Sequence, residues 1–234
     1  YQTERYAVKE LSELINSYNL SREMVPTKAL KFPEVWEALL QKMPYTAMLR
    51  NLGNMSKVGL LKPFSDAEKL VRERLVDVER IRKGRVHPYA LLVAQKTYAQ
   101  GKGVLGKGEW TVAPKVVDAL DDAFYLSFQT IEPTGKRFLI GVDVSGSMSS
   151  SCISSGGKDK YGSPIPGPVR ACEGAAAMAL AIAKVEPECY IHGFAGGNYS
   201  GYYHSGSSNV SGFVDLGITP KMRLDAALKH TVNQ

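Results

Sequence analysis

Three oxygen-bearing side chains alternate along a short segment, as Asp143, Ser145 and Ser147 in the order D-x-S-x-S. They follow Phe138–Val142, a continuous apolar run of the kind that forms a buried strand. A carboxylate and two hydroxyls at a turn can direct three oxygens to one point, and such ligands suit Mg²⁺ or another hard divalent cation. In isolation these residue types more often cap a loop. Their place between a buried strand and a small-residue helix favours a metal site.

The elements that would position this motif alternate between strand and helix. After the first strand we expect an Ala-rich helix, a second apolar strand, a short apolar run and a last helix, over roughly Val169–Val185, Cys189–Phe194, Phe213–Leu216 and Pro220–Val232. This order, with strands buried on both faces, predicts an open, mostly parallel α/β sheet. In such sheets ligands gather at the carboxyl ends of the strands. Two Gly/Ser-rich stretches, Ser149–Pro168 and Gly196–Gly212, are interpreted as rim loops or variable decoration.

Residues 1–132 show helical periodicity instead. We expect one helix with an apolar stripe from Ala7 to Tyr18, followed by five more: from near Pro33, from Pro44 to a stop at Gly53, from Asp66 to Lys83 with Gly84 at its end, from Pro88 to before Gly101, and from Pro114 to about Thr130. Amphipathic helices with short connections predict an α-solenoid, although no clear sequence repeat is visible.

The formal charge of +6 is unevenly distributed. Residues 1–137 carry 22 Lys and Arg against 16 Asp and Glu, whereas residues 138–234 carry seven of each. A cationic part joined to a neutral one is consistent with nucleic acid as a partner. Mild basicity that only aids solubility remains the alternative.

Two groups of residues are candidate RNA contacts: Arg80, Arg82, Lys83, Arg85 and His87 around the end of a helix, and Lys102 and Lys107 in a Gly-rich loop. Clustered cations neutralise phosphates and give salt-dependent binding. Cations near a helix C-terminus also complement the helix dipole, which is an equal alternative for Arg82 and Lys83. His87 precedes Pro88, so it also qualifies as a cap for the next helix.

Two sequence matches that suggest catalysis lack the context that their motifs require. Gly101–Gly106 matches G-x-G-x-x-G and nearly matches a P-loop, but it follows a helix rather than a strand, and Gly108 replaces the P-loop Ser or Thr. Ser145 lacks the G-x-S-x-G context of a hydrolase nucleophile. These motifs therefore predict neither a nucleotide hydrolase nor a serine hydrolase. Three cysteines and no long apolar run indicate an intracellular, cytoplasmic protein without a membrane span.

The chain resembles two known families. Phe138–Met148, FLIGVDVSGSM, resembles the first strand and metal motif of von Willebrand factor A domains. Three longer stretches resemble the Ro autoantigen (TROVE-domain) family: EVWEALLQKMPYTAMLRNLGNMS (Glu34–Ser56), RVHPYALLVAQKTYAQG (Arg85–Gly101) and DALDDAFYLSFQTIEPTGKRFLIGVDVSGSM (Asp118–Met148). The resemblance covers residues 30–150 well and the remainder loosely.

The resemblance implies α plus α/β architecture, with HEAT-like helical repeats at 1–132 and a von Willebrand factor A-like domain at 133–234. We expect the first to be truncated at its N-terminus and the second to be incomplete at its C-terminus. Only Asp143, Ser145 and Ser147 match the family's metal ligands, because Thr219 precedes the last helix and does not fit the second ligand loop. The site would therefore be partial and bind Mg²⁺ weakly.

The function that the Ro resemblance implies is that of a non-enzymatic RNA-binding component of a ribonucleoprotein. Such a protein would bind small structured noncoding (Y) RNAs and the single-stranded ends of misfolded RNAs, in RNA quality control. The alternative is a metal-dependent protein-interaction module, in which a carboxylate of a protein ligand completes the cation shell as in adhesion-type A domains.

Overall fold

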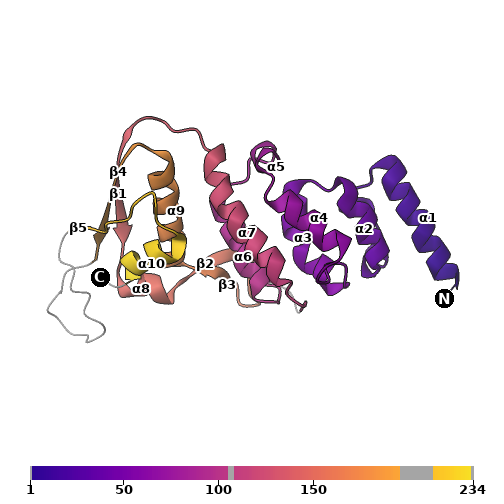
Figure 1. The fold of residues 1–234 in the computed structure, drawn as a ribbon. Coiled ribbons are helices and arrows are strands. Elements are labelled where there is room, and N and C mark those ends of the chain that lie inside the picture. Colours follow the sequence, from indigo (N-terminus) through magenta and orange to yellow (C-terminus); the bar gives the residue numbers. More distant parts are fainter. Residues whose placement is uncertain (1, 105–107, 196–212, 233–234) are drawn as a thin grey trace. The chain divides into compact units, whose positions relative to one another are not determined.

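The structure is a computed structural model that describes residues 2–104, 108–195 and 213–232 (Figure 1). The chain divides into two compact units. The first comprises Tyr1–Val86 and Ala94–Leu126, and the second comprises His87–Val93 and Ser127–Gln234. Helices and sheets are both present, as predicted. Within the described ranges, no helix is long and apolar enough to cross a membrane.

The first unit is helical. Its α-helices are α1 (Gln2–Tyr18), α2 (Pro33–Lys42), α3 (Tyr45–Lys57), α4 (Asp66–Leu75), α5 (Val78–Lys83), the second half of α6 (Pro88–Ala99) and α7 (Pro114–Ser127), with short 3₁₀ turns at Arg22–Met24 and Ala29–Lys31. Local sequence explains their starts. Pro33 occupies the first turn of α2, where its missing N–H costs nothing. The Ser65 and Asp77 side chains accept backbone N–H bonds at the starts of α4 and α5.

The expected stop at Gly53 is wrong, because α3 continues to Lys57. The glycine is required for packing instead. A Cβ atom at position 53 would lie 2.8 Å from the Trp110 ring, closer than real contacts allow. The indole therefore packs directly against the helix backbone.

The single helix expected over Asp66–Lys83 is also wrong, since α4 ends at Leu75 and α5 begins at Val78. The Asp77 carboxylate accepts the Arg80 N–H at 3.1 Å, which makes Asp77 an N-cap rather than a mid-helix residue. Gly84 does end α5, but with φ −73°. It is Arg85 that takes the left-handed conformation, with φ 48°.

Two buried tyrosines join helices of this unit through their hydroxyls. The Tyr45 hydroxyl donates to the Leu75 carbonyl at 2.8 Å. The Tyr98 hydroxyl lies 2.7 Å from the Ser56 hydroxyl and accepts the Ala113 N–H at 3.2 Å. Burial, with a smaller contribution from Asp77, raises the pKa of Tyr45 well above its ordinary value.

We expect Tyr45→Phe to lower the free energy of unfolding by about 1 kcal/mol, because the Leu75 carbonyl loses its buried donor. The raised pKa means that the folded state favours the neutral phenol. The stability that Tyr45 contributes is therefore fully present below the unfolded-state pKa of tyrosine, about 10, and is lost as the pH rises above that value. Urea titrations at pH 7 and pH 10.5 measure both effects. Tyr18→Phe is the control. Because Tyr18 is 72% exposed, this variant should change neither the free energy of unfolding at pH 7 nor its loss at pH 10.5.

The second unit contains a small sheet. Besides the first half of α6, its elements are the 3₁₀ turn Phe128–Thr130, β1 (Arg137–Asp143), α8 (Gly146–Ser150), β2 (Cys152–Lys158), β3 (Pro164–Arg170), α9 (Ala171–Val185), β4 (Glu188–Phe194), β5 (Val214–Asp215) and α10 (Leu224–Val232). The strand order is β1-β4-β5. β1 and β4 are parallel and in register from Arg137–Glu188 to Asp143–Phe194, and β5 is antiparallel to β4.

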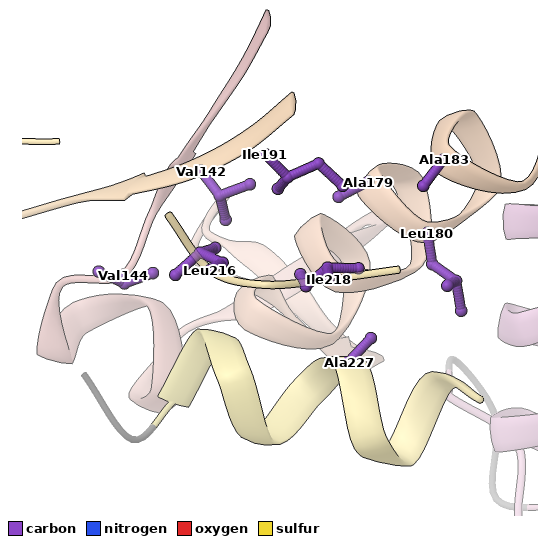
Figure 2. Packing of buried hydrophobic residues seen from close by; sticks show 9 residues of the cluster. All are labelled: Val142, Val144, Ala179, Leu180, Ala183, Ile191, Leu216, Ile218 and Ala227. Atoms are coloured by element: carbon purple, nitrogen blue, oxygen red, sulfur yellow. The ribbon is translucent and has the colours of Figure 1, made fainter. Parts of the chain in front are cut away.

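The core of this unit lies on one face of the sheet, where α9 packs (Figure 2). Its buried members come from both strands, from α9 and α10, and from the chain around β5: Val142, Val144, Ala179, Leu180, Ala183, Ile191, Leu216, Ile218 and Ala227. Small alanines on α9 allow the helix to approach the strands closely.

The expectation that the strands are buried on both faces is wrong for the described residues. β1 and β4 alternate instead, with Val142 and Ile191 buried and Leu139 and Tyr190 exposed at 74% and 57%. Alternation is the pattern of strands covered on one side only. A continuous apolar run alone does not distinguish these two environments.

The predicted loop at Ser149–Pro168 is largely a hairpin, because β2 and β3 pair as a separate antiparallel sheet. Its register shifts twice, as expected for a Gly- and Pro-containing ribbon. The Gly196–Gly212 stretch lies outside the described residues. Cys152, Cys172 and Cys189 are all free thiols, of which Cys172 is buried and Cys189 is partly buried.

Candidate functional site

The D-x-S-x-S motif lies at the carboxyl ends of the two parallel strands. Asp143 is the last residue of β1 and pairs with Phe194, the last residue of β4. The backbone N–H of Val144 donates to the Phe194 carbonyl at 2.9 Å, which extends the pairing by one residue. The chain then turns at Ser145 into the short helix α8. The position at the edge of the sheet is the one that the sequence predicted.

The three oxygen-bearing side chains of the motif lie close together. Asp143 Oδ1 accepts the Ser145 backbone N–H at 2.8 Å, and the Ser145 and Ser147 hydroxyls lie 3.0 Å apart. The bond to the Ser145 N–H uses Oδ1 alone, so Oδ2 and the two hydroxyls stay available for the predicted ligand role. Among the described residues, no cluster of three or more His, Cys, Asp or Glu side chains has the geometry of a metal site. The donor set fits part of an Mg²⁺ shell.

A buried carboxylate holds the chain where it enters β1. Glu186, 9% exposed, accepts the Thr134 N–H at 2.8 Å and the Gly135 N–H at 3.1 Å. Gly135 has φ 68°, in the left-handed region that glycine tolerates best. The EPTG segment before β1 is thus a specific turn clamped from the end of α9.

The cations around the end of α5 differ in how far they are neutralised. Arg80 pairs with Asp77 at 3.2 Å and Arg82 pairs with Glu79, both across one helical turn. Within the described residues, Lys83 and Arg85 are exposed and form no ion pair. Arg85 is also the residue with φ 48°. Lys83 and Arg85 are therefore the members of this set best placed to bind a phosphate.

A further arginine in the same unit has a structural task. Arg74 donates to the Leu40 and Gln41 carbonyls in the last turn of α2, and the Leu40 carbonyl also accepts the Met43 N–H at 3.3 Å. Burial, with a smaller contribution from Arg80, lowers the pKa of the Arg74 guanidinium. Arg74 thus caps a helix and is not a candidate RNA contact.

The remaining predicted contacts differ in their local roles. His87 belongs to the second unit, and its Nδ1 accepts the Tyr89 N–H at 3.1 Å, so it caps α6, which was the alternative interpretation. Lys102 is exposed and forms a β-bridge with Glu109, in a loop tied down where Trp110 Nε1 donates to the Tyr98 carbonyl at 3.1 Å. Lys107 lies outside the described residues.

Phe64 is an exposed aromatic residue that was not predicted from the sequence as a candidate contact. Phe64 lies in the turn before α4, is 85% exposed, and has the Lys115 ammonium 4.5 Å from its ring centroid. The sequence does contain a signal that could have identified it. Pro63 and Phe64 directly precede Ser65, the N-cap of α4, so a bulky residue occupies a turn position that glycine usually takes.

Comparisons with known proteins identify the relatives of this chain. Residues 17–102 match the TROVE domain. The chain is 39% identical over 228 residues to RNA-binding protein RO60 of Deinococcus radiodurans, covering 97% of this chain and 38% of that protein. It is 44% identical over 142 residues to RNA-binding protein RO60 of Caenorhabditis elegans, covering 60% of this chain and 22% of that protein. The resemblance to the Ro family is confirmed.

A solved Ro-family structure extends the likeness to the fold. The crystal structure of the Deinococcus radiodurans Ro (RSR) protein matches with a TM-score of 0.77 and 37% identity, over 96% of this chain and 40% of that chain. This chain therefore spans about two fifths of the length of that Ro protein. Both of its units fall within the matched region, since the match leaves only 4% of the chain uncovered.

Proposed function

We propose that this chain is an RNA-binding part of a ribonucleoprotein and not an enzyme. The observation that carries the proposal is 39% identity, over nearly the whole chain, to a protein named for RNA binding. The surplus of six positive charges in residues 1–137 and the exposed Lys83 and Arg85 support it, because phosphate contacts dominate RNA affinity. The RNAs would be small structured noncoding (Y-like) RNAs and single-stranded ends of misfolded RNA, bound in the cytoplasm in the course of quality control.

The finer description of the fold belongs to the same proposal. We interpret 1–132 as HEAT-like repeats of the TROVE type, supported by the consecutive helices of this region and by the TROVE-domain match over residues 17–102. We interpret 133–234 as a von Willebrand factor A-like domain. The parallel β1–α9–β4 unit, with the D-x-S-x-S motif at the strand ends, supports this interpretation.

The experiment that tests RNA binding is a titration of a labelled stem-loop RNA with a single-stranded tail, across salt concentrations. We expect log K to fall linearly with log salt. The variant Lys83→Ala/Arg85→Ala should bind more weakly and reduce the slope by roughly 0.7–0.9 for each phosphate that the variant no longer neutralises. Arg80→Ala/Arg82→Ala should have a smaller effect, because Asp77 and Glu79 already neutralise these arginines.

The charge-matched control is Lys158→Ala/Lys160→Ala, which removes two exposed cations from residues 138–234, the part of the chain with no net charge. This variant should bind as the wild type does. Absence of salt-dependent binding would contradict the proposal. An equal loss in the control would show that net charge, rather than the α5 end, determines affinity.

A second candidate function rests on the Asp143, Ser145 and Ser147 geometry: a metal-dependent protein-interaction module. The cation would be held by the Asp143 carboxylate and the two hydroxyls, with the remaining positions filled by water or by a carboxylate of a protein ligand. Mg²⁺ titration by calorimetry should show weak binding that Asp143→Ala abolishes. Ser150→Ala is the control, since its hydroxyl donates to the Ser147 carbonyl at 3.2 Å and Ser150 is not one of the three predicted ligands. Identical Mg²⁺ binding by wild type and Asp143→Ala would exclude this site.

A further inference from the structure

Phe64 is held in an unusual conformation at the surface of the helical unit. Residues 62–65, Lys-Pro-Phe-Ser, form a turn closed by the Ser65 N–H, which donates to the Lys62 carbonyl at 3.1 Å. Pro63 takes the second position and Phe64 the third, with φ 67°. That is the position of a type II turn at which glycine is strongly favoured. A bulky side chain there is strained.

The turn is held in place from two sides. The Phe64 N–H donates to Glu68 Oε2 at 3.0 Å, and Glu68 is only 2% exposed. Ser65 caps α4 by accepting the Glu68 N–H at 3.2 Å, and its hydroxyl donates to the Leu60 carbonyl at 3.0 Å. Surroundings that over-determine a strained residue are typical of positions kept for a function. Phe64 contributes little to the core, because it is 85% exposed.

The charges around the ring suit a polyanion. Lys115, from the first turn of α7, places its ammonium 4.5 Å from the ring centroid. Lys62, at the start of the turn, is exposed. With the ammonium on one face, an 85% exposed ring presents its other face to solvent. An open aromatic face beside flexible cations is the arrangement with which proteins bind single-stranded nucleic acid.

We propose that Phe64 is a stacking platform for one base of single-stranded RNA, with Lys62 and Lys115 neutralising the adjacent phosphates. The proposal rests on the RNA-binding function proposed above and assigns it a site distant in sequence from the α5 end. Stacking requires no hydrogen bond to the base edge, so the site accepts any of the four bases.

The experiment compares two probes on the full chain by fluorescence anisotropy: a labelled ten-nucleotide oligouridylate and an abasic ten-mer with the same phosphates. Phe64→Leu removes the aromatic face but keeps an apolar side chain, and Phe64→Trp keeps the face. We expect Phe64→Leu to bind oligouridylate roughly 5- to 100-fold more weakly, as loss of one stacked base implies. Phe64→Trp should bind at least as well as wild type, and all three proteins should bind the abasic probe equally.

The possible outcomes distinguish a failure of the Phe64 stacking proposal from a failure of the RNA-binding proposal. Oligouridylate binding that is salt-dependent but unchanged in Phe64→Leu would overturn the platform and leave the RNA-binding function standing. No binding of either probe at low salt would overturn both. An equal loss by Phe64→Leu on both probes would also overturn the platform, because it would show an effect on phosphate binding or on folding rather than on stacking.

Phe64→Gly controls for folding. Glycine adopts φ 67° without strain, so the thermal midpoint should stay the same or rise while oligouridylate binding falls as it does in Phe64→Leu. A structural role for Phe64 would instead lower both quantities together.

Discussion

Gly53→Ala is expected to lower the free energy of unfolding of the helical unit by about 1–3 kcal/mol. In an exposed helix the same substitution would raise it by about 0.5–1 kcal/mol, so the expected sign is reversed. The reason is the Trp110 ring, whose carbon atoms would lie 2.8–2.9 Å from the new methyl group. The ring cannot withdraw freely, because its Nε1 donates to the Tyr98 carbonyl and it stacks on the Tyr98 ring at 6.2 Å.

Urea unfolding followed by circular dichroism measures this effect. Gly108→Ala is the matched control, since its added methyl meets only the end of the Lys57 side chain at 3.8 Å. In Gly53→Ala/Trp110→Leu the smaller side chain should accommodate the methyl group. The double variant should therefore be more stable than the sum of the two single effects predicts. Strict additivity would show that the two residues do not collide.

Glu186→Ala is expected to lower the free energy of unfolding by about 2–4 kcal/mol, a larger effect than that of Gly53→Ala. The buried carboxylate accepts two backbone N–H groups, of Thr134 and Gly135, and alanine leaves both without an acceptor. Hydrogen bonds to a charged acceptor are stronger than neutral ones. Glu186→Gln keeps one carbonyl oxygen and should lose about half as much.

Glu188→Ala is the control for this prediction. Glu188 lies two residues further along and pairs with Arg137, but both side chains are well exposed, at 50% and 81%. A surface ion pair of this kind contributes about 0–1 kcal/mol. Thermal unfolding monitored by near-UV circular dichroism compares the variants. Similar losses for the two glutamates would contradict the role assigned to Glu186.

In the second unit, β1, α9, β4 and α10 were predictable because their signals are local, whereas the sequence predicted a loop in place of the β2–β3 hairpin. Phe138–Val142 is apolar and Asp143, Ser145 and Ser147 follow within five residues, so the strand brings the three side chains to its own end. The exposure of Leu139 was not predictable. Whether a strand is covered on one face or both depends on segments far away in the sequence, which an apolar run does not specify.

In the helical unit the errors came from residues with two possible roles. In the sequence, Gly53 predicts the end of a helix, and Asp77 resembles an ordinary polar residue within one long helix. Their actual roles depend on Trp110, 57 positions away, and on the competition between capping and helix continuation. The pairing of Arg80 with Asp77 was visible at i, i+3 spacing. The left-handed backbone conformation of Phe64 and Arg85 could not be predicted, because neither residue type favours it.

Tyr98 has a consequence for the motions of the helical unit. Its hydroxyl lies 2.7 Å from the Ser56 hydroxyl of α3 and accepts the Ala113 amide just before α7, so one side chain on α6 ties three helices. The Ala113 amide is thus protected from hydrogen exchange by a side chain rather than by a helix backbone. It can exchange only when α6 and the start of α7 separate, whereas amides inside each helix exchange when that helix frays. Its exchange rate reports the opening of the helices from one another.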